Sequence, residues 1–289
     1  MQGNRKTHIL MIILMLIWTF DTVSISKAVR EVPQITLLCL KYISALPVVY
    51  SVNRIRRPFS MPERKDMKKL FLSALTGFII YYIVEYTAIK HMPVSISTVL
   101  IGILPAVSYV TDCMVRKRKI RKALLGVILL SLGGLAMVVQ SHKETGGGDW
   151  LGVICCFACV FIWVAYGYSL RSLEDDCSSN QITLYQMLIS IPLLLPYTLM
   201  HLPAGLSVND ILFYIVLPGM LSGGLGDLIE VKGLIDLGTT VTGVYLNLLP
   251  VFTAAAGVIF LHETMTVPQI IGSLIVIVCG IYINTQSDV

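Results

Sequence analysis

Long apolar runs, separated by short polar segments, constrain this chain more than any other feature of its sequence. A helix needs about 20 mainly apolar residues to cross the hydrocarbon core of a membrane. Only 13% of the 289 residues are charged, against roughly 25% in an ordinary soluble domain, so little of the chain remains for one. The predicted fold class is all-α integral membrane, with about ten transmembrane helices. The apolar runs predict spans near 8–28, 34–52, 68–89, 94–115, 122–140, 150–171, 181–201, 210–233, 239–261 and 268–285.

Basic residues gather in alternate polar segments of the first half: at Arg5 and Lys6, within 54–69, and within 116–122. The positive-inside rule places these segments in the cytoplasm. We therefore predict a multi-pass protein of the cytoplasmic (inner) membrane, with both termini cytoplasmic because the number of spans is even. This placement accounts for the net charge of +5 and favours membrane lipid, not nucleic acid, as the partner of the basic segments.

The two halves of the chain match each other at a shift of 145 positions. Tryptophan, proline and intramembrane glutamate are scarce, so shared hydrophobicity does not explain the matches, and they indicate a duplication. We predict a first five-helix repeat at 1–140, a connector at 141–149 that contains a Gly-rich tract, and a second repeat at 150–289. Repeats with an odd number of spans are inverted in the membrane, as in secondary transporters whose site lies between the repeats. The matches pair Trp18 with Trp163, Ser24 with Ser169, Pro47 with Pro192, Glu85 with Glu230, and Leu104-Pro105 with Leu249-Pro250.

The second half contains motifs that resemble the EamA-type branch of the drug/metabolite transporter superfamily: 248–252, 260–266, 269–272 and Gly280. The first half is similar at Leu104-Pro105-Ala106. It departs from the pattern where 116–122 replaces a Leu-Gly-Glu segment, where Thr19 stands for the usual glycine, and where Lys41 stands for a frequent arginine. The resemblance implies ten helices, two inverted repeats and a central cavity, and it leaves the substrate open.

Charged side chains inside predicted spans are costly, so we expect them to face a cavity or a partner. They are Asp21, Lys41, Glu85, Asp227 and Glu230. Glu85 and Glu230 occupy equivalent repeat positions and are candidates for two gates or proton stations of one pathway. Asp227 and Glu230 are three residues apart and share a helix face, as do Tyr82 and Glu85. In the alternative, Glu85 extends to the membrane interface near Lys90, and Glu230 pairs with Lys232 or Lys41.

Aromatic and polar residues extend the candidate substrate site. Trp18 and Asp21 share a helix face, and their repeat equivalents are Trp163 and Tyr166. Aromatic faces bind cations, so these side chains are candidates to line a cavity for an amine. Ordinary helix packing is the alternative for each aromatic. The further candidates are Tyr82, Tyr245, Gln186 and its equivalent Lys41, which is predicted to pair with Asp21 or Glu230 or to contact a substrate carboxylate.

These features predict a secondary transporter, an exporter or proton-coupled exchanger, of a small polar metabolite such as an amino acid or amine. Its partners are a small-molecule substrate and, as the coupling ion, protons. The alternatives are an uptake carrier for a cationic amine, a drug-efflux pump and, in another class, a non-transporting scaffold or receptor. We predict no enzyme, cofactor or metal site, because His262-Glu263 lacks the second histidine of a zinc-binding helix and no ATP-binding glycine loop occurs. The sequence leaves the oligomeric state open.

Overall fold

The computed structural model describes residues 5–56, 64–144, 149–171, 179–203, 206–230, 233, 237, 245 and 248–287. The Gly-rich tract 145–148, Lys232 and most of 231–247 lie outside the described residues. Within the described part the chain is helical, without strands. Six predicted spans are single α-helices: α1 (Arg5–Glu31), α2 (Gln34–Arg56), α7 (Lys122–Glu144), α8 (Trp150–Arg171), α9 (Ser179–Met200) and α13 (Val267–Ser287).

The other spans are composite. The third consists of α3 (Arg64–Ser73), the π-helical segment η1 (Ala74–Ile80) and α4 (Tyr81–His91). The fourth consists of α5 (Val94–Ile101) and α6 (Leu104–Val115). The eighth begins with α10 (Val208–Ile211) and continues through the π-helical segments η2 (Leu212–Val216) and η3 (Gly219–Gly226). The described part of the ninth is mainly α12 (Leu249–Leu261).

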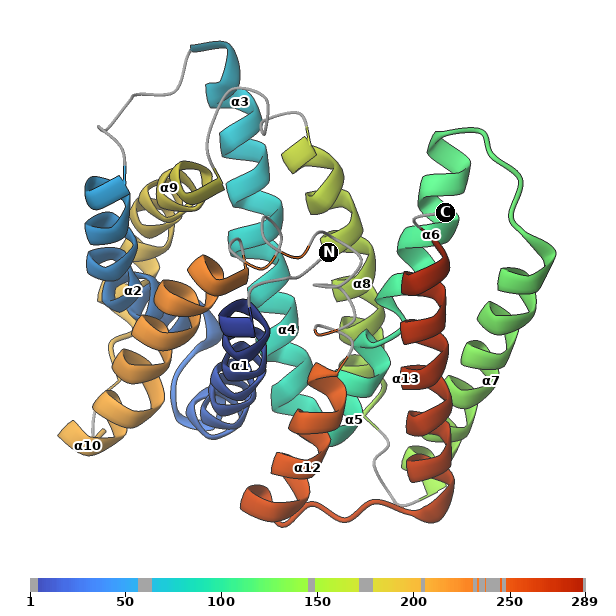
Figure 1. Ribbon diagram of the computed structural model, residues 1–289. Coiled ribbons are helices and arrows are strands. Elements are labelled where there is room, and N and C mark those ends of the chain that lie inside the picture. Colours follow the sequence, from blue (N-terminus) through green and yellow to red (C-terminus); the bar gives the residue numbers. More distant parts are fainter. Residues whose placement is uncertain are drawn as a thin grey trace.

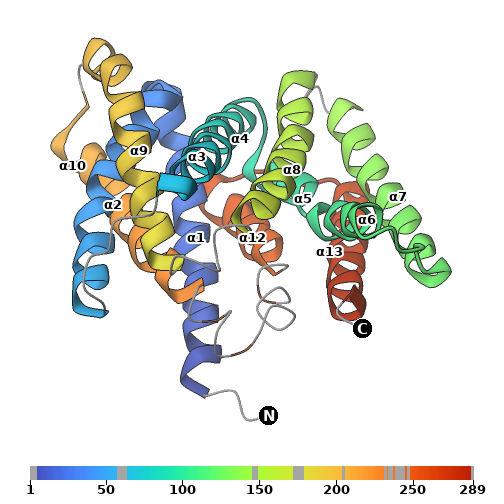
Figure 2. The same cartoon turned by 90° about the horizontal axis from the view of Figure 1, so that it is seen from above.

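Eight of these described segments are long and apolar enough to cross a membrane, and α12 and 267–283 are shorter apolar helices. The prediction of an all-α membrane protein with about ten helices is therefore confirmed. Helices α7 and α13 lie at one edge of the molecule and α2, α9 and α10 at the other, with α1, α4, α5 and α12 between them (Figures 1 and 2). Helices of the first repeat pack on helices of the second throughout: α7 on α13, α2 on α9, α4 on α8, and α5 on α12.

Both repeats interrupt their α-helices at equivalent places. The π-helical segment Ala74–Ile80 corresponds to Gly219–Gly226 at the 145-residue shift. Uninterrupted π-helix is rare and often occurs at functional sites. In the second repeat a Cβ on Gly219 would lie 2.6 Å from the carbonyl oxygen of Lys41, so only glycine permits this approach to α2.

The proline motifs begin helices instead of kinking them. Pro105 and Pro250 each lie in the first turn of their helix, α6 and α12, where the missing N–H removes no helical hydrogen bond. The same helices end in equivalent turns, because Lys117 and His262 both adopt left-handed backbone conformations, with φ of 53° and 54°. The inverted repeats thus share backbone landmarks as well as residue types.

Candidate functional site

A cavity of about 210 Å³ lies among the central helices. It is lined by α1, α4, α5, α6, α8, η3, α12 and α13, and therefore by both repeats. Pro105 and Pro250 are among the lining residues, so both helix breaks open onto this space. Gly102 brings the two breaks together, because a Cβ at this position would lie 3.5 Å from Cγ of Pro250.

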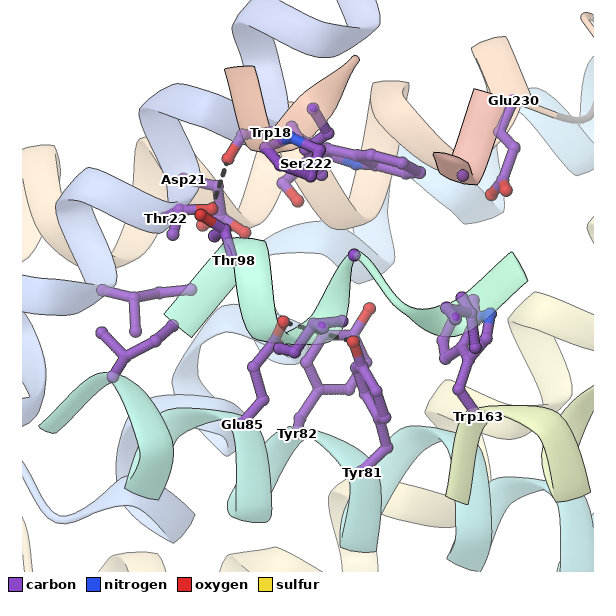
Figure 3. A pocket seen from close by; sticks show the side chains of 18 of the residues that line it. Trp18, Asp21, Thr22, Tyr81, Tyr82, Glu85, Thr98, Trp163, Ser222 and Glu230 are labelled. Carbon is purple, nitrogen blue, oxygen red and sulfur yellow. Dashed lines mark hydrogen bonds between the residues drawn. The ribbon is translucent and has the colours of Figure 1, made fainter. Parts of the chain in front are cut away.

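Two opposing walls carry the polar and aromatic side chains (Figure 3). One wall holds Trp18, Asp21 and Thr22 of α1, with Ser222 and Glu230 from the second repeat. The facing wall holds Tyr81, Tyr82 and Glu85 of α4 and Trp163 of α8. The two tryptophans are repeat equivalents, and they lie on opposite walls.

The aromatic side chains of the second wall form one cluster. The Tyr81 ring lies 5.2 Å from the Tyr82 ring and 4.8 Å from the Trp163 ring, measured between centroids. The Tyr81 hydroxyl donates a hydrogen bond of 3.3 Å to Glu85 Oε1, so a carboxylate stands beside the aromatic faces. An aromatic cluster next to a carboxylate is the combination that binds organic cations.

Lys41 and Asp21 form a buried ion pair behind the first wall. Nζ of Lys41 donates to Oδ1 of Asp21 at 2.5 Å, and neither side chain exposes more than 11% of its surface. The prediction of an ion pair is confirmed, with Asp21 as the partner and not Glu230. Lys41 also lies 5.5 Å from the Tyr86 ring centroid and does not line the cavity.

Glu85 and Glu230 both line the cavity, as repeat symmetry suggested. No ion pair joins either carboxylate to a basic side chain in the described ranges of the chain. Glu85 therefore lies at the cavity and not at the membrane interface near Lys90. The proposed pairing of Glu230 with Lys232 falls outside the described residues.

Five of the eleven predicted site residues do not line the cavity. Besides Lys41, these include Tyr166, whose hydroxyl donates to Oε1 of the buried Gln186 at 3.2 Å. Gln186 in turn donates to Oγ of Ser73 at 2.9 Å, so it joins α9 to α3. Tyr245 contacts His8 Nδ1 through its hydroxyl at 2.8 Å and packs beside α1. Asp227 lies next to η3, outside the lining.

Four lining residues with polar groups were not among the predicted candidates: Thr22, Tyr81, Thr98 and Ser222. Tyr81 carried a signal, since it lies four residues before Glu85 and shares its helix face. The other three are small hydroxyl residues that carry no signal in an apolar run. Among the described residues, no group of three or more histidine, cysteine, aspartate or glutamate side chains is placed to hold a metal ion.

A model of the EamA-like transporter family matches residues 5–140 and again residues 150–286. The chain belongs to this family. The EamA-like chain is 24% identical, over 294 residues and 99% of both chains, to a protein of Archaeoglobus fulgidus named "uncharacterized transporter". It also shares its fold with a protein of known crystal structure, at 15% identity over 97% of both chains and a TM-score of 0.64. The chain is therefore a multi-pass membrane transporter with two repeats of one family.

Proposed function

We propose that this EamA-like protein exports or exchanges a small cationic or zwitterionic metabolite, an amine or amino acid, by alternating access. The observation that carries the proposal is the composition of the cavity walls. Three carboxylates face the space, those of Asp21, Glu85 and Glu230, together with two tryptophans. Among the described residues the ion pair at the cavity is that of Asp21 with Lys41, and no described basic side chain forms an ion pair with Glu85 or Glu230.

An unpaired carboxylate in a low-dielectric site needs a compensating positive charge. A proton or a substrate ammonium group supplies that charge, and the two exclude each other at the same carboxylate. Competition of this kind couples substrate movement to proton movement in the opposite direction. Glu85 and Glu230 suit this role because they lie on opposite walls and in opposite repeats (Figure 3).

The aromatic faces add affinity for the same substrate class. A cation over a desolvated aromatic ring gains about 2 kcal/mol, and about 0.5–1 kcal/mol at an exposed site. Trp18 and Trp163 offer such faces from opposite walls. A substrate with a free carboxylate would place it toward the lining hydroxyl group of Ser222.

The positively charged segments support an orientation in the cytoplasmic membrane with both termini in the cytoplasm. The arrangement of the connections in the fold supports the same orientation. The α6–α7 connection, the start of α3 and the C-terminus lie together, opposite the α12–α13 connection (Figure 1). The α6–α7 connection and the start of α3 are basic in sequence, and we assign this side to the cytoplasm.

The test uses purified protein in liposomes that contain a pH-sensitive dye. Panels of amines, zwitterionic amino acids and anionic metabolites are added outside, and internal pH is recorded. We expect amines or amino acids to move protons, and we expect Glu85→Gln and Glu230→Gln each to abolish this response. Glu31→Gln, the same change at an exposed acid at the end of α1, is the matched control.

Proton movement driven only by anionic metabolites would overturn the substrate class. Full proton movement in the Glu85→Gln/Glu230→Gln double variant would overturn the coupling role of these carboxylates. Silence toward all three panels, with no exchange of labelled substrate, would favour a scaffold or receptor.

A further inference from the structure

Glu263 of the second repeat contacts the first repeat at a place outside the cavity lining. Helix α12 ends at Leu261, and the left-handed turn at His262 directs the chain back toward its own helix. Oε1 of Glu263 accepts a hydrogen bond of 2.7 Å from the backbone N–H of Val94. Oε2 accepts one of 2.9 Å from the N–H of Ser95. A carboxylate of the second repeat thereby satisfies two free N–H groups at the start of α5 in the first.

These two hydrogen bonds are stronger than hydrogen bonds between neutral groups, because the acceptor is charged and the helix start carries a partial positive charge. The surrounding residues are shaped for the carboxylate. A Cβ on Gly257 of α12 would lie 2.5 Å from Oε2 and 3.1 Å from Cδ of Glu263. The N–H of Glu263 also donates to the carbonyl of Gly257 at 3.1 Å, which fixes the turn.

The contact continues from Glu263 down to the cavity. One turn deeper, the Thr253 hydroxyl of α12 donates to the Thr98 hydroxyl of α5 at 2.9 Å. Thr98 lines the cavity, and Gly102 of the same span lies against Pro250. Helices α5 and α12 therefore form a continuous seam from the cavity to the connection that holds Glu263. This seam ends on the α12–α13 side of the molecule, which the topology assigns to the outside (Figure 1).

At the position equivalent to Glu263, the first repeat carries a side chain of opposite charge. The residue equivalent to Glu263 is Arg118, which follows the equivalent left-handed residue Lys117. An arginine side chain has only hydrogen-bond donors, so it cannot accept from helix N–H groups. The outer side of the protein thus has a carboxylate at a position where the cytoplasmic side has a guanidinium.

From this asymmetry we infer that Glu263, with Val94, Ser95 and Gly257, is a latch that closes the cavity on the outer side. The resting protein is closed to the outside and receives its substrate from the cytoplasm. The inference rests on the proposed transport function for its biological meaning. Its test, however, measures access to the cavity and needs no substrate.

The experiment uses the full chain with all seven cysteines replaced and a single reporter, Thr22→Cys, in the cavity wall. A membrane-impermeant maleimide is added from the outside, and the labelling rate is measured. We expect Glu263→Gln to raise the rate about tenfold, which corresponds to about 1.4 kcal/mol in favour of the outward-open state. Gly257→Ala, which displaces the carboxylate without removing its charge, should act in the same direction.

Gly133→Ala is the matched control, because nothing lies within 4 Å of a Cβ at that position. Unchanged labelling in both Glu263→Gln and Gly257→Ala, in protein that elutes as a single species, would overturn the latch. Raised labelling in a protein that transports no member of the substrate panels would support the latch and remove the proposed function.

Discussion

The two repeats share a backbone plan and differ in the chemistry placed on it. In the first repeat Lys41 of α2 donates to Asp21 of α1. At the equivalent positions of the second repeat, Tyr166 of α8 donates to Gln186 of α9 at 3.2 Å. One contact between two neighbouring helices is therefore an ion pair in one half and a neutral hydrogen bond in the other.

The difference shows which of the two contacts serves the cavity. Asp21 lines the cavity, whereas Tyr166 does not, and its partner Gln186 extends away to Ser73. A neutral pair is sufficient to join two helices, and it avoids the cost of desolvating two charges. An ion pair at the equivalent place is thus explained better by a need for a carboxylate at the cavity than by helix packing.

The largest effect is expected from breaking the ion pair at one partner. Lys41→Gln leaves Asp21 as an uncompensated buried charge and should cost about 3–5 kcal/mol of stability. Gln186→Leu, the mirror change in the second repeat, should cost about 1–3 kcal/mol, because it leaves the Tyr166 hydroxyl without its acceptor. Thermal unfolding in detergent measures both.

The double variant Asp21→Asn/Lys41→Gln sharpens the comparison. It copies the neutral chemistry of the second repeat and should recover most of the stability lost in Lys41→Gln. It also lacks the Asp21 carboxylate at the cavity and should therefore lose transport. Equal destabilisation by Lys41→Gln and Gln186→Leu would contradict the distinction between the repeats.

The next effect concerns the π-helical segments. Gly219 of η3 contacts the backbone of α2, whereas its repeat equivalent, Ala74 of η1, already carries a buried Cβ. Gly219→Ala forces the backbones apart and should cost about 1–3 kcal/mol, a typical cost of overpacking. Gly126→Ala in α7 meets no atom within 4 Å and should raise the thermal midpoint, because alanine favours helix over glycine by about 1 kcal/mol. A Gly219→Ala variant as stable as the parent would show that η3 has room to move.

A smaller effect, on substrate affinity, tests the equivalence of the two tryptophans. If both faces hold the same cation, Trp18→Leu and Trp163→Leu should each raise KM about 5- to 30-fold, for a contact worth about 1–2 kcal/mol. Trp150→Leu is the control, because that side chain is 51% exposed at the start of α8 and lies outside the cavity. A change in KM for only one of the pair would assign the substrate to one wall.

Much of the frame was predictable from the sequence, because hydropathy reports spans and the 145-residue shift reports the repeats. The shift also predicted Glu85 and Glu230 as equivalent stations on the two sides of one pathway, and the structure shows both lining one cavity. The choice of Asp21 over Glu230 as the partner of Lys41 was not predictable, because it depends on how α1 packs on α2. Asp227 shows a related limit. Residues three apart are rotated by about 60° on a helix, so this spacing alone does not decide whether both line one cavity: Tyr82 and Glu85 both do, whereas Asp227 does not line the cavity with Glu230.

Other features were only partly indicated by the sequence. The glycines of the run Gly219–Gly226 indicate a weakened helix that either packs closely or bends, but they do not indicate π-helix, and no residue pattern marks η1. Glu263 stood at a predicted helix end, and its partners Val94 and Ser95 lie 169 and 168 residues away. Glu263 lies within the family-like motif 260–266, but this resemblance does not show its role, and its repeat equivalent, Arg118, differs in charge.

The smallest effect is expected at Asp149, which precedes α8 and contacts His91 at the end of α4. The hydrogen bond from His91 lowers the pKa of the Asp149 carboxyl, and a backbone bond from Leu151 adds to this. A carboxyl whose folded pKa is lowered stabilises the protein above its unfolded value of 3.8 and loses this contribution as pH falls through the folded pKa. Asp149→Asn should therefore lower the thermal midpoint slightly at pH 7. At a pH well below the folded pKa of this carboxyl, the substitution should leave the thermal midpoint unchanged.

Salt distinguishes this contact from the buried ion pair. The contact of Asp149 is exposed, so about 1 M salt should remove most of the difference in thermal midpoint, since the screening length is then about 3 Å. The destabilisation by Lys41→Gln should persist in the same salt, because that charge is buried. If salt removed the loss of stability in Lys41→Gln as well as in Asp149→Asn, ions would have access to the Lys41–Asp21 pair. Asp21 would then behave as a surface acid.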